Sequence, residues 1–159
     1  MEKKDEMLSK IQDNSGKIAI LLFISIVLLI FFFSVDIGLL YEISQNPEYF
    51  YASETVGLSM YPNVYTGDMF IIQSNEHPGF NLAHGDIIVY YKENSEGEGY
   101  FVGHRIIGIY NDYYLVKGDA NSISERVYPE QIVGEVIKTI DRYNPIGQYM
   151  FLWVANQDE

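Results

Sequence analysis

The chain contains no cysteine, which excludes disulfide bonds and thiolate metal sites in all of its 159 residues. Basic residues are scarce as well: 10 lysines and arginines stand against 22 aspartates and glutamates, for a net charge of −12. Because binding to nucleic-acid phosphates needs a basic face, this balance argues against a nucleic-acid partner. The three histidines are scattered and make only a weak case for a metal site, so we expect no metal and no cofactor.

Charge is missing altogether from one stretch of the chain. Residues 18–35 form a run of 18 uncharged, mostly apolar residues. As a helix this run would extend over about 27 Å, close to the ~30 Å hydrocarbon core of a bilayer. A cleaved signal peptide has a shorter apolar core and a small-residue cleavage site, whereas no Ala-x-Ala follows this run. We therefore predict an uncleaved transmembrane helix at 18–35, with an extension to 41 as an alternative.

The distribution of basic residues predicts the orientation of this helix. Four lysines precede the run, and no lysine or arginine follows it until Lys92. Basic residues near a span stay on the cytoplasmic side. Residues 1–17 are therefore expected to form a cytoplasmic tail and residues 42–159 an extracytoplasmic domain. The sequence thus predicts a single-pass protein of the cell membrane, with the lipid bilayer as one partner.

The domain at 42–159 alternates short apolar runs with turn-forming residues, which is typical of β-strands. No segment after the apolar run has a convincing helical period, so we predict a mainly β domain. The apolar segment 149–155 contains the single tryptophan and is too short to span a bilayer. It is either part of the core or an aromatic foot resting in the membrane interface.

Three residues of this domain could together carry hydrolytic chemistry. Ser59, His104 and Asp119 each lie in a short segment with glycine or other turn-forming residues. They offer the hydroxyl, imidazole and carboxylate of a serine hydrolase. Ser59 would be the nucleophile. His104, with an ordinary pKa near 6.5, would be its general base, and Asp119 would orient that base.

Five motifs occur in order: Ser-Met-x-Pro from Ser59, a Gly-Asp pair opening a strand, His-Arg-Ile-Ile-Gly from His104, Lys-Gly-Asp-Ala-Asn from Lys117, and Val-Gly-Glu-Val from Val133. Together they resemble the motifs of type I signal peptidases. The resemblance covers roughly residues 54–140 and the apolar run before them. The common bacterial enzymes have a lysine where His104 stands, so the match is closest to the archaeal and endoplasmic-reticulum branch. It implies Ser-His rather than Ser-Lys chemistry.

The resemblance implies a signal-peptidase-like β domain behind one N-terminal transmembrane helix. Such a protein would be a membrane-bound serine endopeptidase that removes signal peptides from secreted preproteins after small residues in an Ala-x-Ala-like pattern. Its partners would be signal-peptide-bearing preproteins and accessory membrane subunits.

The chain departs from the family pattern at two positions. Members usually carry a second aspartate six residues after the position of Asp119, where this chain has Glu125; Glu125 is therefore a reserve candidate for orienting the base. Members often carry a hydroxyl where this chain has Gly57, so we expect an oxyanion hole made by the Ser59 backbone N–H, aided by Thr55. Two alternatives remain: a self-cleaving Ser-Lys peptidase of the repressor type, and a membrane-anchored non-catalytic β-domain or inactive subunit of a peptidase complex.

Overall fold

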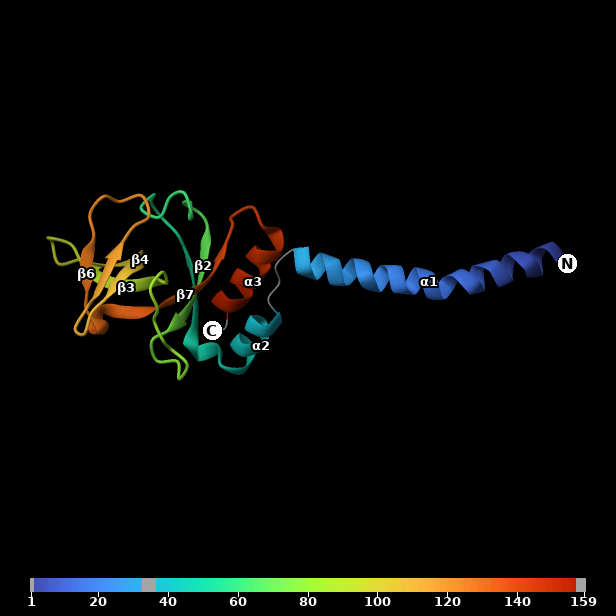
Figure 1. The fold of residues 1–159 in the computed structure, drawn as a ribbon, viewed down its shortest axis with the longest axis horizontal. Helices are drawn as coiled ribbons and strands as arrows, with labels where there is room; N and C mark the ends of the chain where they lie inside the picture. The colour runs from blue at the N-terminus through green and yellow to red at the C-terminus, as the bar shows by residue number, and fades with distance from the viewer. Residues whose placement is uncertain (1, 33–36, 157–159) are drawn as a thin grey trace. The chain divides into compact units, whose positions relative to one another are not determined.

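The structure, a computed structural model, describes residues 2–32 and 37–156 (Figure 1). The chain divides into two units, Met1–Ile37 and Gly38–Glu159. The first contains one helix, α1 (Glu2–Phe32). The remaining elements are, in order, α2 (Ile37–Gln45), β1 (Phe50–Glu54), β2 (Met69–Ser74), β3 (Ile87–Glu93), β4 (Gly99–Ile109), β5 (Tyr114–Lys117), β6 (Glu125–Val127), β7 (Ile132–Ile140) and α3 (Pro145–Ala155), with short 3₁₀ turns at Pro47–Tyr49 and Pro129–Gln131.

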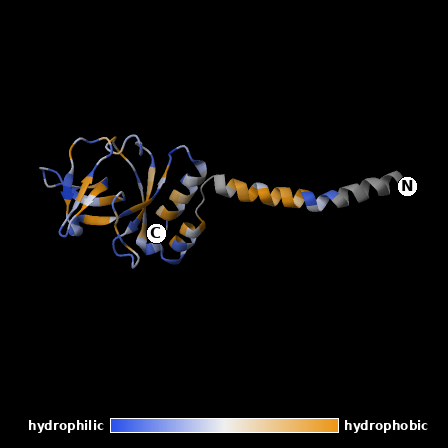
Figure 2. Ribbon diagram, in the orientation of Figure 1, coloured by the Kyte–Doolittle hydropathy of each residue, from blue (hydrophilic) through white to orange (hydrophobic). Residues whose placement is uncertain are grey.

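The part of helix α1 that follows Lys17 is apolar (Figure 2). Within the residues that the structure describes, no helix has both the length and the apolar character needed to cross a membrane. The transmembrane helix predicted at 18–35 reaches into residues 33–36, which lie outside the described residues.

One seven-stranded sheet forms the second unit, and all of its strand pairs are antiparallel. The strand order is β1-β2-β7-β3-β4-β5-β6, so β7 returns between two earlier strands. The prediction of a mainly β domain is therefore confirmed. Its strands come from the alternating runs of the sequence, since side chains of one parity face one side of the sheet.

Three hydrophobic clusters make up the core. The first lies where α2 and α3 cover β1, β2 and β7, and includes Ile43, Phe50, Ile71, Ile140 and Val154. The second joins β3 to β6 and includes Ile88, Tyr90, Ile106, Val116 and Val127. The third packs the β1–β2 connection against β2 and β3 and includes Met60, Val64, Phe70, Ile72 and Val89. The third cluster fixes the segment that contains Ser59.

The sequence did not predict α2, and it left open whether the apolar segment 149–155 is a core strand, a core helix or a foot in the membrane interface. Helix α2 lies in what reads as a polar connector, and it buries Ile43 in the first cluster. Helix α3 contains the apolar segment 149–155. It begins at an Asn144 cap that accepts a hydrogen bond from Gly147 N–H, and it buries Val154 in the same cluster. The apolar C-terminal segment therefore contributes to the core.

Candidate active site

Ser59 lies in the turn-rich segment that connects β1 to β2. Gly57, two residues earlier, has φ of +98°, a conformation that residues other than glycine rarely adopt. The Thr66 hydroxyl donates to the Gly57 carbonyl at 2.8 Å and accepts from the Gly57 N–H at 3.1 Å. On the other side of the serine, Met60 and Val64 are buried in the third cluster. The turn is thus anchored on both sides of Ser59, which is itself half-buried.

The Ser59 turn also packs against the end of β5. The Ser59 carbonyl accepts a hydrogen bond from Ala120 N–H at 2.8 Å. A Cβ atom on Gly118 would lie only 2.6 Å from that carbonyl oxygen, so the close approach requires glycine. Strand β5 pairs with β4 so that Lys117 lies opposite the residue that follows His104. The nucleophile turn therefore packs against the end of β5, the strand that neighbours β4 and its His104.

His104 is buried on β4, with 7% of its surface exposed. Its Nδ1 atom lies 2.9 Å from the Tyr90 hydroxyl oxygen and 3.2 Å from Oε1 of Glu125. Burial lowers the pKa of the His104 imidazole, and the nearby Glu125 charge offsets only part of this effect. A lowered pKa favours the neutral ring, which is the state that a general base needs.

The second ring nitrogen of His104 remains accessible. Over residues 2–32 and 37–156, no side-chain nitrogen or oxygen is both fully buried and without a hydrogen-bond partner. His104 Nε2 makes no hydrogen bond with a described group, so it keeps contact with solvent. The Ser59 hydroxyl likewise makes none with His104 in the described structure. A nucleophile and its base often come into hydrogen-bond range only when substrate binds.

Glu125, at the start of β6, is the carboxylate that contacts His104. Burial opposes its ionisation, but hydrogen bonds from Lys92 and Tyr90 outweigh that effect and lower the pKa of Glu125. The strand register explains its position, because β6 returns antiparallel to β5 and pairs Glu125 with Val116. Val116 belongs to the second cluster, and His104 contacts Tyr90 of that cluster, so Glu125 is brought back to the histidine face.

Asp119, the first choice for orienting His104, instead pairs with Arg105. Its two oxygens accept from Nε at 2.9 Å and from Nη2 at 2.7 Å of that guanidinium. It also accepts from Asn63 Nδ2 at 2.8 Å, and Asn63 belongs to the Ser59 turn. The structure therefore brings Asp119 to the nucleophile turn and Glu125 to the base, which differs from the order favoured by the sequence. The physical reason is side-chain direction, since Asp119 lies in the turn after β5 and pairs with Arg105, whose side chain faces the opposite side of β4 from that of His104.

Replacing Asp119 with asparagine should lower the free energy of unfolding at pH 7 by about 1–2 kcal/mol, because charge-assisted hydrogen bonds to Arg105 are lost. The Arg105 hydrogen bonds lower the pKa of Asp119. Their contribution is therefore complete above the ordinary aspartate pKa of about 3.9 and is lost as pH falls through the lower folded value. Urea unfolding of the full chain in micelles, followed by Trp153 fluorescence, would measure both effects.

The difference between wild type and this variant should accordingly shrink below about pH 4. The exposed turn residue Asp112 provides the control, since its replacement by asparagine should change the unfolding free energy by less than about 0.5 kcal/mol. A difference that stays constant down to pH 3 would show that the Asp119 charge does not stabilise the fold.

The oxyanion hole stays a prediction, and its two positions differ in their surroundings. The Ser59 N–H lies in the turn beside the cavity described below. Thr55, by contrast, directs its hydroxyl to backbone carbonyls, those of Tyr65 at 2.7 Å and Asp68 at 2.9 Å. A hydroxyl carries one hydrogen, and the Thr55 hydroxyl directs its hydrogen to these carbonyls of the turn. It therefore has no hydrogen left to donate to an oxyanion. The contribution expected from the Thr55 side chain is therefore not supported.

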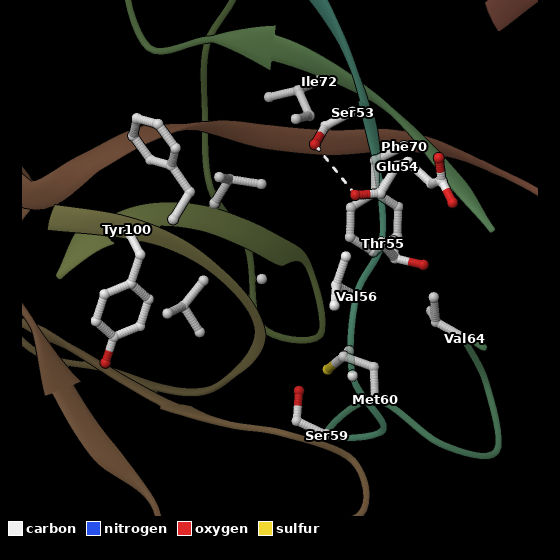
Figure 3. A pocket seen from close by; sticks show the side chains of 15 residues that line it. Ser53, Glu54, Thr55, Val56, Ser59, Met60, Val64, Phe70, Ile72 and Tyr100 are labelled. Atoms are coloured by element: carbon white, nitrogen blue, oxygen red, sulfur yellow. Dashed lines mark hydrogen bonds between the residues drawn. The ribbon is translucent and has the colours of Figure 1, made fainter. Parts of the chain in front are cut away.

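A cavity of about 270 Å³ opens beside Ser59. Its floor is apolar and comes from the third cluster, with Met60, Val64, Phe70, Ile72 and Val89. Residues 53–57 form one wall and residues 100–103 of β4 form the other. Figure 3 shows the Ser59 hydroxyl directed into this space, with Tyr100 and Val56 on opposite sides. The arrangement places a hydroxyl at one end of an apolar cleft.

Both walls of this cleft present unpaired strand edges. Thr55 N–H donates to the Asp68 carbonyl, so alternation along the strand directs the backbone groups of Glu54 and Val56 away from β2. Strand β1 is also the edge of the sheet.

On the opposite wall, β4 pairs with β3 along its whole first half, while its pairing with β5 begins only at Arg105. The backbone groups of Phe101 and Gly103 therefore point into the cleft. An extended peptide could bond to both walls.

Lys117, Lys92 and His77 have structural partners, whereas His84 lies exposed. Lys117 Nζ donates to the Asn121 carbonyl at 3.0 Å, and Lys92 contacts Glu125. His77 accepts from Gly79 N–H at 3.0 Å, and His84 lies exposed in the loop before β3. In the described ranges, no group of three or more histidine, cysteine, aspartate or glutamate side chains could hold a metal ion.

Sequence reasoning missed Tyr90 and Lys92 as members of this site. Tyr90 sits inside an apolar strand run, and nothing in that run marks it as polar in function. Lys92 reads as the beginning of a charged loop.

A comparison with protein-family models gives no match for this chain, and a comparison with curated proteins gives none either.

Proposed function

We propose that this chain is a membrane-bound serine endopeptidase that removes signal peptides from secreted preproteins. The observation that carries the proposal is that His104, in contact with Glu125, lies on β4, while the Ser59 turn packs against the end of β5, the strand beside it. The order of motifs along the chain supports the same reaction. In this proposal Glu125 orients the base, and Asp119 holds the nucleophile turn through Asn63 and Arg105.

Each step of the reaction has a group to perform it. The Ser59 hydroxyl attacks the scissile carbonyl carbon while its proton passes to Nε2 of His104. The Ser59 N–H stabilises the oxyanion that forms. The carbon–nitrogen bond then breaks as His104 gives that proton to the leaving amine. Water attacks the resulting ester, loses a proton to His104, and Ser59 recovers it as the new carboxylate departs.

The cleft beside Ser59 suits an extended substrate. A peptide added between the unpaired edges at 53–57 and 100–103 would form backbone hydrogen bonds on both sides. Alternate side chains would then point to the apolar floor of a cavity of about 270 Å³ shared by several positions. A shared volume of this size favours small side chains next to the scissile bond, in keeping with an Ala-x-Ala-like preference.

A membrane tether would complete the proposal. The apolar part of α1 and the residues that follow would hold the domain outside the cell membrane, with residues 1–17 in the cytoplasm. A signal peptide places its own apolar core in the bilayer, so its cleavage site emerges near the headgroups. A tethered protease would meet that site at high effective concentration without tight binding.

The Ser-Lys alternative has little support from the site. Lys117 is bonded to the Asn121 carbonyl. The Glu125 hydrogen bond raises the pKa of Lys92, which makes it a weaker source of free amine at neutral pH. The non-catalytic alternative has one observation in its favour, the missing hydrogen bond between Ser59 and His104. A binding domain would hold the signal peptide in the same cleft without cutting it.

Covalent labelling distinguishes the proposed peptidase from the non-catalytic domain. Full-length protein in lipid vesicles should react with a serine-directed acylating inhibitor at Ser59, identified by peptide mass. The label should disappear in Ser59→Ala and persist in Ser44→Ala, which removes an exposed serine on α2. The same vesicles should cut a reporter preprotein at an Ala-x-Ala junction. Binding of the preprotein without label or cleavage would favour the non-catalytic domain and contradict the proposal.

A further inference from the structure

Tyr90 lies between His104 and Glu125, and the reaction described above gives it no role. Its ring is 1% exposed and packs in the second cluster with Ile88 and Ile106. Its hydroxyl oxygen lies 2.9 Å from Nδ1 of His104 and also contacts Oε1 of Glu125. A buried tyrosine hydroxyl needs a polar partner, and this one has two of different chemistry. One is an ionised acceptor and the other a ring nitrogen.

The chemistry of these partners decides where the single hydroxyl hydrogen lies. An ionised carboxylate can only accept hydrogen bonds. Glu125 stays ionised because Lys92 and Tyr90 both donate to it. The Tyr90 hydroxyl itself stays protonated, since burial and the Glu125 charge raise its pKa. Tyr90 therefore donates to Glu125, and its oxygen is left as an acceptor for His104.

We propose that Tyr90 is a positioning residue that fixes His104 in the tautomer with hydrogen on Nδ1. The chain of hydrogen bonds runs from Nδ1–H to the Tyr90 oxygen, and from the Tyr90 hydroxyl hydrogen to Oε1 of Glu125. Nε2 is then left with the lone pair that takes the serine proton. The catalytic consequence rests on the proposed function, whereas the tautomer rests only on the contacts of these three residues.

His77 serves as an internal reference because its contacts favour the opposite tautomer. Gly79 N–H donates to its Nδ1 at 3.0 Å, and the Gln73 amide nitrogen lies 3.1 Å from the same atom. A backbone N–H can only donate, so Nδ1 of His77 must hold a lone pair. In the neutral ring its hydrogen is therefore on Nε2, which faces Glu42 at 3.6 Å. His77 and His104 should give opposite nitrogen patterns in one spectrum.

Nitrogen NMR of the full chain in detergent micelles tests the tautomer directly. At neutral pH the protonated and unprotonated ring nitrogens resonate in separate regions, and His77→Gln and His84→Gln variants would assign the three rings. We expect wild-type His104 to be protonated on Nδ1. In Tyr90→Phe both nitrogen shifts should move toward each other, as the two tautomers mix. Its kcat for a reporter preprotein should fall roughly tenfold, with KM changed less than about twofold, the loss expected for one hydrogen bond.

Tyr91→Phe is the matched control, since it removes an exposed hydroxyl from the next residue of β3, whose contact is Glu93 at 3.4 Å. It should change neither the nitrogen shifts nor kcat. A second variant, Glu125→Gln, tests the chain from its other end. An amide N–H can donate to Nδ1, so this variant should carry its hydrogen on Nε2. This second test holds even if the tyrosine variant folds poorly.

Several results would overturn the inference. Wild-type His104 protonated on Nε2 would do so, and so would Tyr90→Phe with unchanged nitrogen shifts, even if its unfolding midpoint fell. Failure of the proposed function gives a different result. A chain that cuts no preprotein, but keeps the Nδ1–H pattern in wild type and loses it in Tyr90→Phe, supports the inference and removes the peptidase proposal.

Discussion

His104→Ala should slow cleavage of a reporter preprotein by about 10²–10⁴-fold, the range typical of a lost general acid–base residue. Without the imidazole, the Ser59 hydroxyl keeps its proton during attack, and the leaving amine departs without one. Both halves of the reaction use this group, so the effect should fall on kcat and leave KM nearly unchanged. The measurement is a single-turnover rate with full-length protein and substrate in the same vesicles.

The control for this prediction is His84→Ala, which removes an exposed histidine from the loop before β3 and should leave the rate within about twofold. If His104→Ala cut as fast as wild type, a lysine base would have to be sought. Lys117→Ala would then be the decisive variant. If the wild type itself were silent, the non-catalytic alternative or a missing accessory subunit would take precedence.

Glu125→Gln should reduce kcat by a factor on the order of 10³, while Asp119→Asn should reduce it by less than about tenfold. The difference follows from the contacts. Glu125 lies 3.2 Å from Nδ1 of His104, and an amide in its place would force the hydrogen onto Nε2, where the lone pair is needed. Asp119 contacts Arg105 and Asn63, so its loss loosens the nucleophile turn without changing the base.

This pair of variants compares the two carboxylates that the sequence left as candidates. Rates measured under single-turnover conditions, together with the folded fraction of each variant, would separate lost chemistry from lost protein. A larger loss in Asp119→Asn than in Glu125→Gln would show that Asp119 orients the base during turnover. The contact between Glu125 and His104 would then belong to the resting state alone.

The strands could be predicted from the sequence because short apolar runs bounded by turn-forming residues are typical of buried strands. The runs at 69–72 and 87–91 fall within β2 and β3. The helices α2 and α3 could not be predicted in the same way. Short helices depend on tertiary packing more than on local propensity. Ile43 and Val154 are buried only because the sheet provides the surface that covers them.

The sequence was enough to predict which residue types form the candidate site and that they lie in or near turns. Ser59 and His104 stand in recognisable segments, and the structure places the Ser59 turn at the end of β5 and His104 on the neighbouring strand β4. The choice of carboxylate depends on the register of β5 against β6, which pairs Val116 with Glu125, and no local pattern fixes that register. Tyr90 could be found only after β3 and β4 were paired. Tyr90 is two residues from Ile88, the partner of His104, so its side chain lies on the same face of the sheet as His104.

The unpaired edges that border the cleft have a further consequence for the behaviour of the isolated protein. An open slot between two strand edges does not distinguish a substrate from a strand of another molecule, so it is also a site for strand exchange and aggregation. Glu54 lies on one of these edges, and the domain carries a strong negative charge. Two copies that approached through their clefts would bring like charges together. The acidity that gives the chain its low isoelectric point would therefore protect the open cleft from self-association.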